Sequence, residues 1–261
     1  MRPIHLTAVA LALALAAPAR AADSLQAAYA LQHQHRWQEA EQAFRQALAA
    51  KPDAAHYAAL ADFLDLTGRP ADGLAVAEKG LSAFPQDAPL AAADAECLGD
   101  VGHYHASMAL CNRELARSRH TTTPKATLAR FRLILAGDQG DAAQKDGIFA
   151  MFKYAFSVKA NIDKARTLDP TYARAVYGAG MYEAESPIGG NLTEGIALLE
   201  KAHRLDPDDY GIDLDLISQL AHAGHKSEAR KELAAFEKAF SGLPAARHDI
   251  RPLEKKLGTG D

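Results

Sequence analysis

Histidine pairs are the side chains of this chain best suited by type and spacing to hold a metal ion. They are His33/His35, His103/His105 and His222/His225. Imidazole is a common ligand of zinc and copper, but a lone pair leaves two positions of a tetrahedral site unfilled. We expect each pair at a turn of a different helical unit, roughly 20 Å from the next pair, so the pairs cannot share one ion. We therefore expect no metal and no other cofactor, with a metal site at one pair as the alternative.

A glycine-rich stretch, "ESPIGGN" over 185–191, could bind a phosphate or form a turn between two helices. Free backbone amides at a helix start can bind anions, but a P-loop also needs a Lys followed by Ser or Thr, which this stretch lacks. We interpret Pro187 as the end of one helix and Gly189-Gly190 as residues able to take positive φ. Asn191, with Glu194 three residues later, fits the cap of a helix beginning at Leu192. A structural turn is the expectation, and an anion site the alternative.

Motifs typical of enzymes are missing from the sequence. It contains no His-Glu-x-x-His, no Gly-x-Ser-x-Gly and no Cys-x-x-Cys. We expect no enzyme and no catalytic residue, and keep an enzyme with an unrecognised site as a distant alternative.

The first 21 residues have the pattern of a secretory signal peptide. Arg2 precedes an apolar run from Leu6 to Ala17 that is too short to span a bilayer, and Ala19-Arg20-Ala21 fits a cleavage site. We expect a periplasmic or secreted protein with no membrane span after cleavage; an uncleaved anchor is the alternative. Loss of Arg2 and Arg20 leaves 27 basic against 33 acidic residues, so the net charge moves from −4 to −6. This charge argues against nucleic acid or anionic lipid as a general partner.

Short motifs that contain proline recur along the remaining chain, and their spacing predicts an all-α fold. "KPDA" at Lys51, "FPQDA" at Phe84, "LDPTY" at Leu168 and "LDPDD" at Leu205 each follow an amphipathic segment. Pro52 and Pro85 are 33 residues apart, and Pro170 and Pro207 are 37 apart, so "ESPIGGN" falls at an expanded turn inside one unit. Periods of this length, with helical patterns and small residues inside each unit, indicate a repeat array. A different helical bundle with chance periodicity is the alternative.

The pattern resembles the tetratricopeptide repeat family from about Ser24 to Phe240, although several units lack the large aromatic near the start of the first helix. The resemblance implies a right-handed α-solenoid of about five helix pairs. Its expected parts are a signal peptide (1–21), three repeats (22–119), a degenerate repeat or connector (120–168), two repeats (169–240) and a polar tail or capping helix (241–261).

The resemblance also implies that the first helix of each unit lines a concave groove. On these helices we expect an acidic face with interleaved aromatic and apolar positions, which suits a basic or partly apolar protein segment. The candidate partner-binding residues are Tyr29, Asp62, Asp65, Glu96, Asp100, Tyr177, Met181 and Glu185, with Leu25 and Leu214 beside them. The second and third units carry Ala58, Asp62, Ala92 and Glu96 where carboxylate-clamping members of the family use Lys, Arg and Asn. The alternative is an ordinary solvated helix face, with binding elsewhere.

Two cysteines, Cys97 and Cys111, lie in the two helices expected for the third unit, on either side of the turn "GDVGH". In an exported chain such a pair can form a disulfide. Two buried small apolar side chains are the alternative.

The segment from about Ile162 to Leu233, with its Pro-x-Gly-Gly turn, also resembles the T-component of tripartite periplasmic transporters. The leading hypothesis is a non-catalytic exported scaffold that binds a protein or peptide. The runner-up is a transport accessory that docks a solute-binding protein.

Overall fold

The computed structural model describes residues 17–186 and 189–258, and in these ranges every regular element is an α-helix. The helices are α1 (Ala17–His33), α2 (Trp37–Ala50), α3 (Ala54–Leu66), α4 (Pro70–Ala83), α5 (Ala88–Asp100), α6 (Tyr104–Arg117), α7 (Lys125–Asp146), α8 (Ile148–Leu168), α9 (Ala173–Glu185), α10 (Leu192–Leu205), α11 (Tyr210–His222), α12 (Lys226–Phe240) and α13 (Pro244–Leu257). The predicted all-α class is confirmed.

The recurring short motifs of the sequence lie at the helix boundaries in the structure. Asp53, Asp87 and Asp209 are N-caps, and their side chains accept a hydrogen bond from a backbone N–H in the first turn of α3, α5 and α11. At the opposite end of α3, Gly68 takes φ +77°, a left-handed conformation that favours glycine. Each first helix therefore stops at a turn, and the second helix runs back along it.

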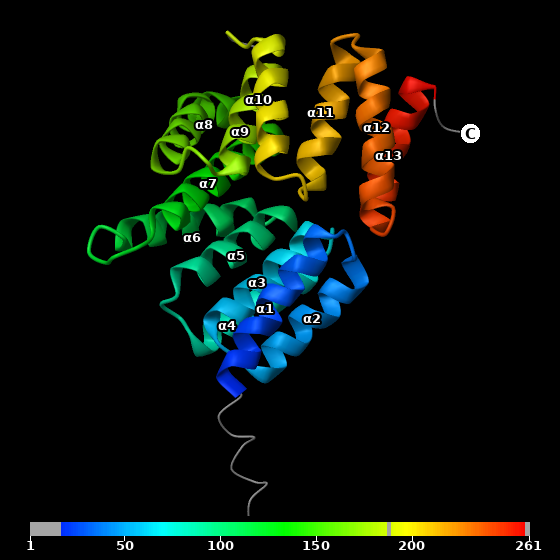
Figure 1. The fold of residues 1–261 in the computed structure, drawn as a ribbon. Helices are drawn as coiled ribbons and strands as arrows, with labels where there is room; N and C mark the ends of the chain where they lie inside the picture. Colours follow the sequence, from blue (N-terminus) through cyan, green and yellow to red (C-terminus); the bar gives the residue numbers. More distant parts are fainter. Residues whose placement is uncertain (1–16, 187–188, 259–261) are drawn as a thin grey trace, which may run out of the picture.

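The helix pairs stack side by side into an α-solenoid (Figure 1). Within each pair the two helices pack together, and the first helices also contact each other from α3 to α5, α7, α9 and α11 in turn. The segment expected to be a degenerate repeat or connector is itself the pair α7–α8, longer than the others at 22 and 21 residues. The C-terminal segment contains α13, which packs against α11 and α12.

The two ends of the solenoid meet, which the repeat pattern does not predict. Trp37 at the start of α2 stacks on Phe240 at the end of α12, with ring centroids 5.8 Å apart, and its indole N–H donates to the carbonyl of Ala239 at 3.3 Å. Both rings belong to a buried apolar cluster that includes Phe44 of α2 and Ile250 of α13. In most repeat proteins a unit contacts only its neighbours. Here the stack curls until the end of α12 meets the start of α2 (Figure 1).

Most of the predicted signal peptide lies outside the described residues, as does Pro187 of the predicted turn. None of the described helices combines the length and the apolar composition that a bilayer crossing requires.

Candidate functional site

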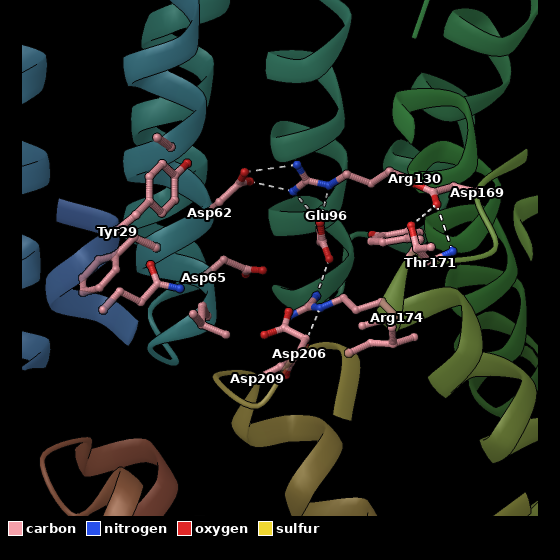
Figure 2. Close-up of a pocket in the computed structure, with 17 residues that line it drawn as sticks. Tyr29, Asp62, Asp65, Glu96, Arg130, Asp169, Thr171, Arg174, Asp206 and Asp209 are labelled. Carbon is pink, nitrogen blue, oxygen red and sulfur yellow. Dashed lines mark hydrogen bonds and ion pairs between the residues drawn. The ribbon is translucent and has the colours of Figure 1, made fainter. Parts of the chain in front are cut away.

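A cavity of about 460 Å³ lies on the concave side of the solenoid. Its walls come from α1, α3, α5, α7 and α9, and the α10–α11 loop at 206–209 closes one side (Figure 2). Six carboxylates and two guanidinium groups line it, together with apolar surface from Tyr29, Phe63, Leu66 and Leu205. Its volume falls within the usual range for ligand sites, and the mixed lining suits an amphipathic side chain.

Two arginines organise the centre of the cavity. Arg130 of α7 donates to Asp62 of α3, Nη2 to Oδ1 at 2.6 Å, and to Glu96 of α5, Nε to Oε2 at 2.7 Å. Arg174 of α9 also donates to Glu96, and to Asp209 Oδ2 at 2.7 Å. Glu96 thus lies between the two guanidinium groups (Figure 2). The network joins four helices and the α10–α11 loop.

The charges of this network offset one another. Burial opposes ionisation of Glu96, yet Arg130 and Arg174 outweigh that effect and lower its pKa to about 2. Burial likewise opposes the charge of Arg130, but Asp62 and Glu96 raise its pKa well above the usual value. An incoming carboxylate would have to displace Asp62, Glu96 or Asp209 before it could reach either arginine.

Three other carboxylates of the cavity have no cationic partner among the described residues. Asp65, Asp169 and Asp206 form no ion pair within the described part of the chain. Burial, followed by repulsion from Asp100 and Glu96, raises the pKa of Asp65 to about 9. Burial and then Asp209 raise the pKa of Asp206. The cavity therefore holds acidic groups whose ionised forms would gain from a cationic neighbour.

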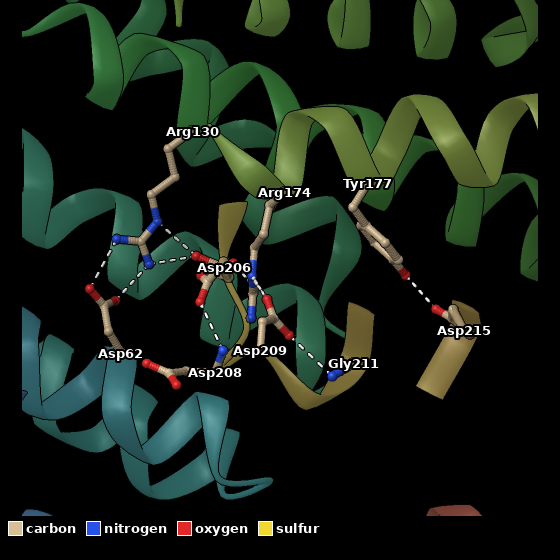
Figure 3. Close-up of polar contacts among 10 residues, drawn as sticks. Asp62, Arg130, Arg174, Tyr177, Asp206, Asp208, Asp209, Gly211 and Asp215 are labelled. Atoms are coloured by element: carbon tan, nitrogen blue, oxygen red, sulfur yellow. Dashed lines mark hydrogen bonds and ion pairs between the residues drawn. The ribbon is translucent and has the colours of Figure 1, made fainter. Parts of the chain in front are cut away.

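The α10–α11 loop connects the cavity to the first pair of helices. Asp209 binds Arg174 (Figure 3), whereas the side chain of Asp208 hydrogen-bonds His33, the last residue of α1. His35 Nε2 also lies 3.9 Å from Asp208 Oδ1. The histidine pair of the first unit thus contacts the junction of the last two pairs of helices. Among the described residues, no three His, Cys, Asp or Glu side chains form a group that could hold a metal ion.

The structure brings together only part of the predicted groove face. Tyr29, Asp62, Asp65 and Glu96 line the cavity, and Asp100 lies beside Asp65 at the exposed end of α5.

The other three candidates, Tyr177, Met181 and Glu185, face α11 instead. Tyr177 donates to Asp215 at 2.6 Å, Glu185 accepts from Gln219 at 3.0 Å, and Met181 packs against the apolar cluster that joins the two ends. Figure 3 shows the Tyr177–Asp215 bond well apart from the arginines.

Sequence reasoning missed both arginines and the 206–209 loop as parts of the site. Arg130 belongs to the segment treated as degenerate, and Arg174 lies in the first turn of α9, ahead of the positions assigned to the groove face. A usable signal exists: each of two first helices carries one arginine, and the first helices before them carry Asp62 and Glu96. With these contacts, the groove contains opposite charges in place of the uniformly acidic face that we expected.

The predicted helix cap at the glycine turn is formed. Asn191 is the N-cap of α10, and its side chain accepts from the backbone N–H of Glu194 at 3.2 Å. Gly189 takes φ +74°, and a Cβ on Gly190 would lie 2.6 Å from the carbonyl oxygen of Ser186. Both glycines therefore have a conformational or steric reason to be there.

The disulfide expected between Cys97 and Cys111 is not formed in the structure, where both are free, buried thiols. The physical reason is orientation. Cys97 Sγ faces Gly73 of α4, whereas Cys111 packs in a cluster with Ala92 of α5 and Phe131 of α7. The two side chains fill different helix–helix contacts, as in the alternative of two buried small residues.

Comparison with solved structures identifies the fold as that of tetratricopeptide repeat proteins. A thermophilic TPR protein from Thermus thermophilus is 19% identical over 78% of this chain and 98% of its own, with a TM-score of 0.59. The type IV pilus biogenesis factor PilW is 14% identical over 88% of this chain and 98% of its own, with a TM-score of 0.49. The TPR2AB domain of yeast Sti1, solved as a complex with pHSP90, is 13% identical over 92% of this chain and 99% of its own, with a TM-score of 0.40.

At these identities the likeness shows the fold alone. No known family model and no curated protein sequence matches the chain. The resemblance to the T-component of tripartite periplasmic transporters gains no support from these structures.

Proposed function

We propose that this chain is a non-catalytic scaffold that binds a protein segment in the concave groove, with a Lys or Arg side chain of that segment in the cavity. The proposal rests on one observation: some carboxylates of the cavity are bound to arginines and others are not. Asp62, Glu96 and Asp209 are already bound to arginines, whereas Asp65, Asp169 and Asp206 form no ion pair in the described ranges. The solenoid fold supports it as well, because such folds present extended concave surfaces to their partners.

Apolar groups beside these acids favour a side chain with an aliphatic stem. Tyr29 and Leu205 are 39% and 41% exposed, and both line the cavity. A lysine or arginine could cover them with its methylene groups while its charged end approaches Asp65 and Asp206. An acidic segment would meet unpaired carboxylates and two arginines that are already engaged.

A set of synthetic peptides tests this function directly. Apolar-flanked peptides that differ only in one central residue, Lys, Arg, Asn or Glu, would be titrated against the protein by fluorescence anisotropy. We expect the Lys and Arg peptides to bind, with association slowing as salt is raised. Equal binding of the Glu peptide would overturn the proposal.

The structure also indicates which carboxylates to change. Replacing Asp62 or Glu96 would disrupt the arginine network, so loss of binding there could reflect altered folding. Asp65→Asn and Asp206→Asn leave that network intact, and each should weaken binding about 10-fold, equivalent to about 1.4 kcal/mol. Glu237→Gln, on the exposed surface of α12, is the matched control and should bind as the wild type does.

We further propose that the chain is exported and works in the periplasm or outside the cell. The support is the signal-peptide pattern of residues 1–21. Mass spectrometry of the protein purified from a periplasmic fraction should give a chain that begins near Ala22. Recovery of an uncleaved chain from the cytoplasm would contradict this localisation.

A further inference from the structure

A row of phenylalanines on α8 is exposed and has no part in the proposed groove. Phe149, Phe152 and Phe156 are 87%, 74% and 89% exposed. Their spacing of three and then four residues places them on one face of the helix over two turns. The other large apolar side chains that are exposed in the described ranges, Tyr29 and Leu205 among them, have less than half their surface accessible.

The row is uncovered because α8 extends past its neighbour. Lys159 of α8 lies 3.9 Å from Glu183 of α9, and α9 ends two residues later at Glu185. The part of α8 that precedes Lys159 therefore runs beyond the end of α9, at one edge of the molecule (Figure 1). The opposite face of α8 is already packed against the core, since Ala150 and Tyr154 are buried in the cluster formed with α5, α6 and α7.

The exposed area is large enough to form an interface. Three phenylalanine side chains at these exposures present on the order of 500 Å² of apolar surface, comparable to the largest patch of a typical monomer. Two such faces packed together would bury on the order of 1,000 Å², the lower bound for a specific interface. A second copy of this chain supplies the matching face without any other partner.

Charges on this part of α8 leave the rings accessible. Between residues 148 and 162 the only charged residues are Lys153 and Lys159. The Lys153 ammonium lies 4.8 Å from the ring centroid of Tyr154, and that of Lys159 lies 5.4 Å from the ring centroid of Tyr182. Both lysines therefore lean to the sides of the row, and no carboxylate interrupts it.

We infer that Phe149, Phe152 and Phe156 form a homodimer interface in which two α8 helices pack antiparallel across a two-fold axis near Phe152. Such an interface needs one self-complementary patch, and this row provides it. An antiparallel pair places Phe149 of one copy against Phe156 of the other, because these residues flank Phe152 on the same face. The net charge of −4 makes an anionic membrane surface a less favourable occupant.

Sedimentation equilibrium of the full chain tests the dimer. We expect a monomer–dimer equilibrium for the wild type and a monomer for the double variant Phe152→Ser, Phe156→Ser at the same concentrations. Leu205→Ser is the matched control, an exposed apolar residue away from α8, and should dimerise normally. Circular dichroism would verify that each variant is folded. A monomeric wild type, or a double variant that still dimerises, would overturn the inference.

Engineered cysteines test the antiparallel arrangement. Phe152→Cys should crosslink to its own copy across the axis, and the double variant Phe149→Cys, Phe156→Cys should crosslink between copies. Those two positions are roughly 10 Å apart along one helix, too far for a disulfide within a copy. Phe149→Cys alone should crosslink poorly, and the native cysteines are buried. Efficient crosslinking by Phe149→Cys alone would contradict the antiparallel packing.

Vesicle flotation separates the dimer from a lipid-binding face. With vesicles of phosphatidylcholine and phosphatidylglycerol, we expect the protein to stay in the unbound fraction. A wild-type protein that floats with the vesicles while the double serine variant does not would overturn the inference and assign the row to a lipid surface.

Discussion

At the scale of single residues, Glu96 is the group on which the groove depends most. It is the shared acceptor of Arg130 and Arg174, and its side chain is only 13% exposed. Glu96→Gln keeps the shape but removes the charge, leaving two partly buried guanidinium groups with one carboxylate each. We expect a loss of about 2–4 kcal/mol in the free energy of unfolding, because removing one partner of a buried ion pair leaves the other uncompensated.

Urea denaturation of this variant would measure the loss, with Glu39→Gln as the control. Glu39 pairs with Arg36 on the surface, and both side chains are about half exposed. That change should alter stability by less than about 1 kcal/mol, as for other exposed pairs. Equal effects of the two variants would mean that the groove network contributes no more than a surface pair.

A second residue-scale prediction concerns Asp138 of α7, which is 4% exposed. Burial, and then repulsion from Asp141 and Asp100, raises its pKa to about 7 from the usual 3.8, although Ser107 partly opposes the shift. The folded state then binds more protons than the unfolded state between about pH 4 and 7, so this group makes stability fall as pH rises through that window. The slope is at most about 1.4 kcal/mol per pH unit.

Asp138→Asn should flatten that decline, because the amide does not titrate. Thermal melts of the variant and the wild type at several pH values should show the largest gain for the variant above pH 7 and little difference near pH 4. The difference between the two proteins isolates this group from Asp94, whose pKa burial also raises, to about 6. Parallel pH profiles would contradict the assignment.

The thiols give a third prediction at this scale. Since Cys97 and Cys111 occupy different packing contacts, we expect both to remain reduced in the folded protein. Burial raises the pKa of each thiol far above its usual value, so both should react slowly until the chain unfolds. Titration with a thiol reagent in denaturant should count two free thiols. A count of zero would restore the disulfide.

At the scale of elements, the turn before α10 depends on a cap and a close backbone approach. Asn191→Ala should reduce the free energy of unfolding by roughly 1 kcal/mol through loss of the bond to the Glu194 amide. Gly190→Val should cost more, because the added side chain would lie against the carbonyls of Ser186 and Glu183. Thr193→Ala, an exposed change in the same turn of the helix, is the control. Thermal stability unchanged by Gly190→Val would contradict this account.

Local signals in the sequence were sufficient to predict most helices but not their side-chain partners. Aspartates before helices and glycines after them act over a few residues, so the boundaries of α3, α5 and α10 could be inferred. The partner of Asp62 lies 68 residues away at Arg130, and the partner of Glu96 lies 78 residues away at Arg174. Such contacts depend on how tightly successive pairs curl, which no local pattern encodes. For the same reason the sequence did not predict that Tyr177 and Glu185 hydrogen-bond α11 outside the cavity.

At the scale of the whole molecule, curvature makes the groove into a cavity. An open stack would present first helices along a shallow surface. Here the junction of Trp37 with Phe240 brings the two ends together, and His33 contacts Asp208 in the loop that closes the cavity. The exposed face of α8 lies outside this closure, so the proposed groove binding and the inferred α8 dimerisation would use separate surfaces.

The junction gives the last prediction. Trp37 is 4% exposed and contacts α12 through both its ring and its N–H, so Trp37→Ala should lower the free energy of unfolding by about 3–5 kcal/mol. Phe131→Ala, which removes a fully buried ring from the cluster formed by α5, α6, α7 and α8, should cause a similar loss. Only Trp37→Ala should also release α12 and α13 from the first pair, since Phe131 takes no part in the junction. Small-angle X-ray scattering of the folded variants should then show a larger radius of gyration for Trp37→Ala alone. An unchanged radius would mean that the remaining contacts, such as His33 with Asp208, are enough to hold the two ends together.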